Sequence, residues 1–238
     1  MSAETLLSIV LPTRGRRGLV ERLLGNLAET AQQPDRLEVV LYLDRDDEPS
    51  HAVQHGGLKL TKIIGPRAKM GVMSRACQQA AAGRHVMLLN DDVVCRTAGW
   101  DTAVVGAFER FPDGIALVWC NDLCRGAAMA SFPAVSRRAC ELMGGICPAD
   151  YNRDYIDTHL FDIFRKLAAL GHNRLVFLRQ VVLEHMHHEV GKADLDETYR
   201  KVRQSADELA FIAWEEQRQI IAEDLVRHIE ASSACVLP

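Results

Sequence analysis

The sequence predicts an α/β protein with a mostly parallel β-sheet that is covered by helices on both faces. Short apolar runs alternate with segments of helical periodicity over the first hundred residues, which is the pattern of parallel strands joined by helical crossovers. The chain has 238 residues, of which 48% are hydrophobic and 25% are charged. This composition is typical of a globular protein and allows one sizeable domain or two small ones.

Four apolar runs predict the strands in the first half of the sheet. The runs cover residues 6–11, 37–43, 58–64 and 86–89. Each ends at a polar or turn-forming residue, as buried strands do. Polar clusters that begin at Thr13, Asp44 and Asn90 follow three of these runs. Because the carboxyl ends of parallel strands share one edge of a sheet, where ligands bind, we expect these three clusters to lie together.

Helical patterns occupy the connecting segments. Apolar residues recur at intervals of three and four between residues 17 and 29, and Gly83 marks the end of a helix that begins near Met70. Later we expect helices over residues 100–110, 136–143 and 157–169, and extended segments over residues 115–119 and 175–183. We assign residues 1–192 to the main domain and residues 193–238 to a helical extension, which packs outside the core or serves a partner subunit in a homo-oligomer.

Composition excludes several classes of protein. The formal net charge of −4 argues against a general nucleic-acid binder, which shows a basic face. The seven cysteines have no recurring paired spacing and match no zinc module, which is typical of free thiols in a reducing cytoplasm. No apolar run approaches the ~18 residues of a membrane-spanning helix, and the first residues lack the features of a signal peptide. We therefore expect a cytoplasmic protein without a transmembrane segment.

The segment Asn90-Asp91-Asp92 interrupts an apolar run. Two adjacent carboxylates at the end of a buried strand need a partner that offsets their desolvation, and a divalent cation is the usual one. Asp92 is the first expected metal ligand. The alternative is that Asp91 and Asp92 only begin a turn or cap the next helix.

A second candidate for metal binding is the histidine cluster after the last expected strand. Three of the four residues 185–188 are histidines, and a strand that leads into such a cluster can deliver an imidazole to a cation held elsewhere. His185 is the expected ligand and His187 is the alternative. Carboxylate and imidazole together suit Mn²⁺ or Mg²⁺, with phosphate oxygens completing the shell. The competing interpretation is a solvated loop.

Several charged residues complete the candidate site. Lys69, Arg75 and Arg14 are positioned to neutralise a diphosphate, unless they are ordinary surface cations. Asp44 ends a strand, and a carboxylate there can accept the N–H of a nucleobase; the alternative is a turn aspartate.

Two carboxylates, Asp154 and Asp157, lie in a segment that is rich in Tyr and Arg. Either could take a proton from an incoming hydroxyl, and Asp157 could equally be the N-cap of the helix it begins. The candidate acceptor contacts are Trp119, Asn121, Asp122 and Arg125.

The order of these segments resembles the family 2 inverting glycosyltransferases of the GT-A fold. The resemblance spans roughly residues 8–192 and rests on seven short motifs. These are Pro12-Thr13-Arg14, Asp44, residues 69–83, residues 88–93, Gly144-Gly145, residues 154–157 and Glu184-His185. It implies sugar transfer from a nucleotide-diphosphate sugar, with a UDP-sugar favoured, to an unidentified hydroxyl acceptor.

The resemblance also implies a role for each residue. Pro12, Thr13, Arg14 and Asp44 would hold the nucleoside, and Asn90 and Asp92 would stand at the Asp-x-Asp motif. His185 would contact the same metal. Asp157 would be the catalytic base, with Asp154 as the alternative. Two positions depart from the family pattern: Asn90 is neutral, and Ile156 precedes Asp157 where the family has Glu.

Two other functions remain as alternatives. A sugar nucleotidyltransferase usually has a Gly-rich loop after its first strand, and this loop contains only Gly15 and Gly18. A non-catalytic nucleotide-sugar-binding module is supported by the neutral Asn90.

Overall fold

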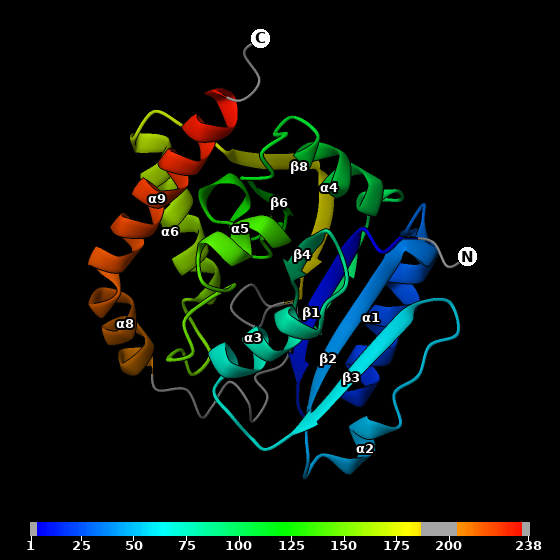
Figure 1. Cartoon of the computed structure of the whole chain (residues 1–238). Coiled ribbons are helices and arrows are strands. Elements are labelled where there is room, and N and C mark those ends of the chain that lie inside the picture. Colours follow the sequence, from blue (N-terminus) through cyan, green and yellow to red (C-terminus); the bar gives the residue numbers. More distant parts are fainter. Residues whose placement is uncertain (1–3, 187–203, 235–238) are drawn as a thin grey trace.

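The computed structural model of the protein describes residues 4–186 and 204–234 (Figure 1). Its strands are β1 (Leu7–Thr13), β2 (Leu37–Asp44), β3 (Lys59–Gly65), β4 (His85–Leu88), β5 (Val93–Cys95), β6 (Leu117–Asn121), β7 (Ala134–Ser136) and β8 (Leu175–His185). Its longer helices are α1 (Arg17–Thr30), α3 (Met70–Ala80), α4 (Trp100–Phe108), α6 (Ile156–Ala169), α8 (Gln204–Ala213) and α9 (Glu215–Ala234). The shorter ones are η1 (Pro34–Arg36), α2 (Glu48–His51), η2 (Gly126–Ala128) and α5 (Arg137–Leu142).

The strands form one sheet in the order β3-β2-β1-β4-β7-β6-β8-β5. Strands β1, β2, β3 and β4 pair in parallel, as do β6 and β8, whereas β7 and β5 are antiparallel to their neighbours. The predicted mostly parallel α/β architecture is therefore confirmed. The sequence did not predict β5 and β7, because each is only three residues long and too short to show a period of its own.

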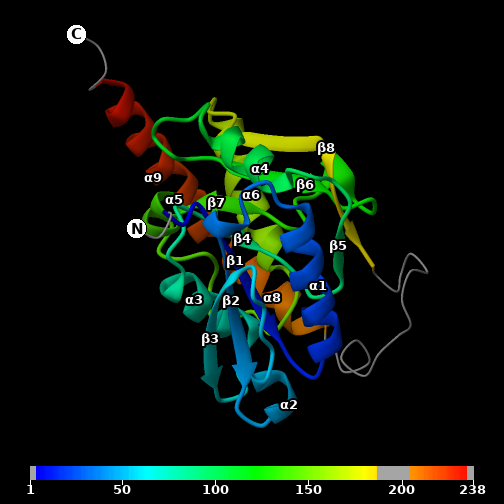
Figure 2. The ribbon, with the colours of Figure 1, turned by 90° about the vertical axis from the view of Figure 1, so that its right-hand side faces the viewer.

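Helices cover both faces of the sheet because side chains alternate along each buried strand. In β1, Ile9 and Leu11 join the hydrophobic cluster of α1 and α4, whereas Val10 joins the cluster of α3, α5 and α6. Figure 2 shows α1 and α3 on opposite sides of strands β1 to β3. The parallel pairing of β1 with β2 and β4 brings the carboxyl ends of these strands to one edge, where the polar clusters follow.

Within residues 204–234, the expected carboxyl-terminal helices are present as α8 and α9. Ile221, Leu225 and Ile229 of α9 are buried in the same cluster as Leu160 and Phe164 of α6, so α9 covers α6 on the side away from β1 to β3 (Figure 1). In residues 4–186 and 204–234, no helix combines the length and the apolar character that crossing a membrane requires.

Candidate active site

The three predicted polar clusters meet at the carboxyl edge of the sheet. Thr13 at the end of β1 donates a hydrogen bond from Oγ1 to Oδ2 of Asp91, at 2.7 Å. Arg14 donates from Nη1 to Oδ2 of Asp44, at the end of β2, also at 2.7 Å. Pro12 lies beside Tyr42 in the parallel register of β1 and β2. The expectation that residues 13–14, Asp44 and residues 90–92 lie together is confirmed.

Asp44 is a buried carboxylate with one oxygen available. Asp44 is only 3% exposed. Arg14 binds its Oδ2. The other oxygen, Oδ1, is buried and accepts no hydrogen bond within the described part of the chain. An acceptor of this kind costs folding free energy unless a ligand supplies a donor. Arg14 also binds both oxygens of the exposed Asp46, at 2.5 and 2.9 Å. The hydrogen bonds from Arg14 lower the pKa of Asp46 to about 2.

Asp91 is held from two sides. It accepts hydrogen bonds from Thr13 and, at 2.8 Å, from Nη1 of Arg16. Desolvation raises the pKa of Asp91, although the charge of Arg16 and the Thr13 hydroxyl oppose that rise. Arg16 was not among the predicted site residues. The signal that could have identified Arg16 is a basic residue three positions beyond β1, at the sheet edge where the carboxylates of Asp91 and Asp92 are expected.

Asp92 and His185 lie side by side, as predicted for two ligands of one metal ion. Oδ1 of Asp92 is 3.3 Å from Nε2 of His185. The antiparallel pairing of β5 with β8 places Val93 opposite His185, and the amide of Met186 donates to the carbonyl of Asp92 at 2.9 Å. Asn90 is exposed, and His187 lies outside the described residues.

Asp157 lies in the first turn of α6, whose N-cap is Tyr155. Asp157 is therefore not the helix cap, which was the alternative to a catalytic role. It is partly buried, and its Oδ1 accepts a hydrogen bond from the amide of Thr158 at 2.8 Å. Desolvation raises its pKa to about 6, against the opposing effects of Thr158 and the positive charge of Arg125. Asp154 precedes the helix, and its amide is bound to Asp207 at 2.9 Å.

The candidate acceptor residues differ in their placement. Asp122 is buried, and its Oδ1 accepts the amides of Cys124, Arg125 and Gly126 at 2.8 to 3.0 Å. Burial acts to raise the pKa of Asp122, but these hydrogen bonds outweigh it and leave the pKa below its usual range. Trp119 is buried and donates to the carbonyl of Gly126.

Of the other two acceptor candidates, Asn121 accepts the amide of Leu123. Arg125 is exposed, and its positive charge acts to lower the pKa of Asp157. Leu123 and Tyr155 have positive φ angles of 56° and 67°. Such strain in residues other than glycine is concentrated at functional sites. One of these residues is in the Asp122 loop and the other adjoins the helix of Asp157.

Lys69 and Arg75 support a different segment. Nζ of Lys69 donates to the carbonyl of Asp150 at 3.2 Å, and Nη1 of Arg75 donates to the carbonyl of Cys147 at 2.9 Å. Neither makes a hydrogen bond or ion pair with residues 13–14, Asp44 or residues 90–92 in the part of the chain that the structure describes.

Comparison with solved structures identifies the architecture. A mannosyltransferase, PcManGT from Pyrobaculum calidifontis in complex with GDP-Man and Mn²⁺, matches with a TM-score of 0.58 and 17% identity over 99% of this chain and 77% of that one. Glucosyl-3-phosphoglycerate synthase from Mycobacterium tuberculosis, in complex with Mn²⁺, UDP and phosphoglyceric acid, matches with a TM-score of 0.53 and 16% identity over 79% and 74% of the two chains. This protein has the GT-A glycosyltransferase fold.

A third GT-A structure, TarS from S. aureus, matches with a TM-score of 0.53 and 13% identity over 82% of this chain and 41% of that one. No protein-family model matches the sequence, and no curated protein matches it. At these identities the comparisons establish the fold, and the residues themselves must support the chemistry.

The donor set of this GT-A domain fits a divalent cation that is shared with a ligand. Asp92 offers a carboxylate oxygen and His185 an imidazole nitrogen, 3.3 Å apart, and both are ligands that Mn²⁺ accepts. Within residues 4–186 and 204–234, no group of three His, Cys, Asp or Glu side chains forms a complete metal site. Asp92 and His185 would therefore be two of the ligands, and oxygens of a bound diphosphate would add to the shell.

Proposed function

We propose that this protein is an inverting glycosyltransferase that moves a sugar from a nucleotide-diphosphate sugar to a hydroxyl acceptor and uses Mn²⁺ or Mg²⁺. The observation that carries this proposal is the approach of Asp92 to His185, 3.3 Å apart at the carboxyl edge of the sheet. Two ligands that lie 93 positions apart in the sequence meet beside the cluster of Thr13, Arg14 and Asp44. Such a pair suits a cation that bridges protein and diphosphate.

Asp44 is proposed to recognise the nucleobase. Its Oδ2 is bound to Arg14, so only Oδ1 is available to a ligand. One acceptor matches the single ring N–H of uracil, whereas guanine presents two adjacent donors on the same edge. This match supports a UDP-sugar as the favoured donor. Thr13 at the end of the neighbouring strand β1 holds Asp91 through a 2.7 Å hydrogen bond.

Asp157 is proposed as the catalytic base, and Asp154 is the alternative. With a pKa of about 6, Asp157 is mostly ionised at neutral pH and still basic enough to accept a proton, as general-base catalysis requires. It takes the proton of the acceptor hydroxyl as that oxygen bonds to the anomeric carbon. The bond from this carbon to the diphosphate oxygen breaks on the opposite face, so the configuration inverts in a single displacement.

The divalent cation supplies charge stabilisation to the leaving diphosphate when it is bound. Asp92 and His185 hold it, and Arg16 keeps the neighbouring Asp91 in place through a 2.8 Å hydrogen bond. Arg125 is exposed beside Asp157 and is the proposed acceptor contact.

Calorimetric titration with UDP, GDP, ADP and CDP, with Mn²⁺ and after its removal, tests this function. We expect one nucleotide to bind in a metal-dependent manner, and we expect Asp92→Ala to abolish that dependence. Asp35→Ala is the matched control, because Asp35 is exposed in η1, which precedes the amino end of β2. Release of nucleotide from the matching sugar donor should then require an acceptor. Failure of the folded protein to bind any nucleotide would refute the proposal, and binding without turnover would favour the non-catalytic alternative.

A further inference from the structure

The segment that leads to the proposed base is held by a single buried carboxylate from the carboxyl-terminal helices. Asp207 of α8 is 1% exposed. Its Oδ1 accepts the amide and side-chain Nδ2 of Asn152, at 2.7 and 2.9 Å. Its Oδ2 accepts the amides of Arg153 and Asp154, both at 2.9 Å. Three consecutive backbone amides thus depend on a side chain that lies more than fifty positions later in the sequence.

A second residue of α8 contacts the next position of the same segment. Phe211 follows Asp207 by four residues, so both lie on one face of the helix. The Phe211 ring packs against the ring of Tyr155, with centroids 5.2 Å apart. Tyr155 has the positive φ of 67° and is the N-cap of α6. Asp207 and Phe211 together therefore contact every residue from 152 to 155, immediately before Ile156 and Asp157.

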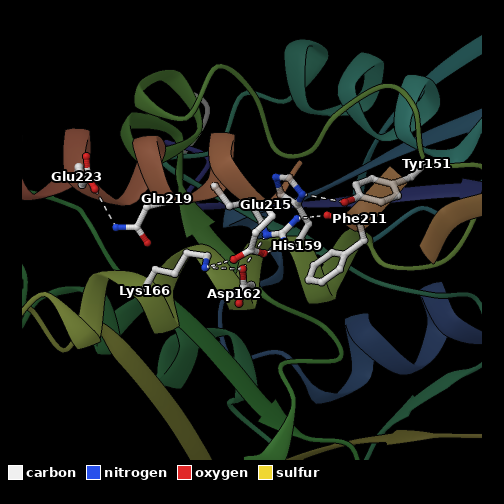
Figure 3. A network of polar contacts seen from close by, with 9 residues as sticks. Tyr151, His159, Asp162, Lys166, Phe211, Glu215, Gln219 and Glu223 are labelled. Carbon is white, nitrogen blue, oxygen red and sulfur yellow. Dashed lines mark hydrogen bonds and ion pairs between the residues drawn. The ribbon is translucent and has the colours of Figure 1, made fainter. Parts of the chain in front are cut away.

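Helix α8 is in turn fixed to α6 through Arg218 of α9. The buried Arg218 donates from Nε to Oδ2 of Asp162 in α6 at 2.6 Å and from Nη1 to the carbonyl of Phe211 at 2.5 Å. Its guanidinium lies 3.6 Å from the centre of the Phe211 ring. Figure 3 shows Phe211, Asp162 and Glu215 gathered at this junction. The loop before Asp157 and the helix α6 that carries it are thus both bound to α8 and α9.

The opposite side of the segment rests on the amino terminus of α3. The amides of Met70 and Gly71 donate to the carbonyls of Asn152 and Tyr151, both at 2.9 Å. Gly71 is required at this contact, because a Cβ there would lie 2.3 Å from the carbonyl oxygen of Pro148. The segment is therefore clamped between α3 and α8, and Asp207 supplies the charged side of the clamp.

We propose that Asp207 is a positioning residue for the catalytic base, and that α8 and α9 belong to the catalytic unit through it. This inference rests on the proposed function and on Asp157 as the base. An anionic acceptor that satisfies three amides and a side-chain amide makes short, charge-assisted hydrogen bonds. Removal of the carboxylate takes this partner away from the four donors, which are partly buried, and the loop can then shift to satisfy them elsewhere. A displacement of about 1 Å at a reacting group can reduce a rate by about a hundredfold.

Three variants separate positioning from general support of the fold. Asp207→Ala removes all four hydrogen bonds. Asp207→Asn keeps one oxygen acceptor and should therefore recover part of what Asp207→Ala loses. Glu208→Ala is the matched control, because Glu208 is the next residue of α8 and is exposed.

Each variant is measured in three ways. These are the Mn²⁺-dependent Kd for the nucleotide, kcat and KM for transfer, and amide hydrogen exchange of residues 152–158 compared with β2. For Asp207→Ala we expect kcat to fall by about a hundredfold, a nucleotide Kd within twofold of the wild type, and at least tenfold faster exchange confined to residues 152–158. Asp207→Asn should lie between Asp207→Ala and the wild type, and Glu208→Ala should match the wild type.

Two results would overturn the inference. One is a kcat for Asp207→Ala within twofold of the wild type. The other is faster exchange that extends equally to β2, which would indicate a purely structural role. Failure of the proposed function would be distinct, since wild-type protein would then bind no nucleotide or transfer no sugar before any variant is made.

Discussion

Replacement of Asp157 by Asn tests the proposed base through both rate and stability. With a pKa of about 6, about nine-tenths of the carboxyl groups are ionised at pH 7 and about a tenth at pH 5. We therefore expect kcat/KM of the wild type to fall about tenfold per unit below pH 6. Asp157→Asn should lower kcat by two to four orders of magnitude, roughly the contribution of a general base. It should leave the nucleotide Kd unchanged.

The same raised pKa gives a stability effect of known sign. Because the pKa rises from 3.8 in an ordinary aspartate to about 6 in the folded protein, the folded state binds the proton more tightly than the unfolded state. Stability is therefore lost as pH rises from 3.8 through 6, and the whole penalty is present at pH 7.5. A shift of about 2 units corresponds to about 3 kcal/mol. The partial exposure of the carboxyl group reduces our expectation to about 1–2 kcal/mol.

Asp157→Asn should accordingly gain this free energy of unfolding at pH 7.5 and gain little at pH 4.5. Urea unfolding at the two pH values measures the difference, and Asp35→Asn, at an exposed position, serves as the control. An active Asp157→Asn variant, or one that is less stable than the wild type at pH 7.5, would refute the assignment of Asp157 as a desolvated catalytic base.

Two further substitutions test the proposed nucleobase contact of Asp44 and the packing of the carboxyl-terminal helices. Asp44→Ala should weaken nucleotide binding by about ten- to a hundredfold, as the loss of a charged hydrogen bond predicts. It should lower the Tm only slightly, because Oδ1 of Asp44 is an unpaired buried acceptor in the described structure and Arg14 keeps Asp46 as a partner; a large loss of Tm with unchanged affinity would contradict the role. Arg218→Met should reduce the free energy of unfolding by about 2 kcal/mol. Breaking a buried ion pair costs about 3–5 kcal/mol, but the partner Asp162 is 24% exposed and can be solvated. Arg227→Met, at an exposed position, is the control in urea unfolding, and equal losses in both variants would contradict the prediction.

The sequence was most informative where the position of a site residue depends on a single strand. The ends of β1, β2 and β4 follow from apolar runs, and parallel packing brings their polar clusters together whatever the details of the loops. The pair of Asp92 and His185 was found for a related reason, since a buried carboxylate and a histidine cluster each need an unusual partner. Asp154 and Asp157 could not be separated by spacing. The structure places them differently: Asp157 lies in the first turn of α6, whereas Asp154 precedes the helix and its amide is bound to Asp207.

The sequence was less informative where a residue acts through a distant partner. Asp207 adjoins Glu208 in a helix near the end of the chain, and charged residues of a helix usually form a solvated face. Only the tertiary fold brings it to residue 152. Lys69 and Arg75 both donate to backbone carbonyls of residues 147–150, which the sequence did not indicate, and their contact with a diphosphate stays a prediction. Asp122 was a candidate contact for the sugar acceptor because it is a carboxylate. Its Oδ1 accepts hydrogen bonds from three amides of its own loop.

Backbone hydrogen bonds connect the two proposed metal ligands to the loop beside the proposed base. The amide of His185 donates to the carbonyl of Asp122 at 3.1 Å, and the amide of Met186 donates to the carbonyl of Asp92. The end of β8 is thereby fixed to the segment after β4, which carries the proposed metal ligand Asp92, and to the loop after β6. The carboxylate of Asp122 then places Arg125, whose charge reaches Asp157. The frame that aligns Asp92 with His185 is therefore the same frame that builds the loop beside the base.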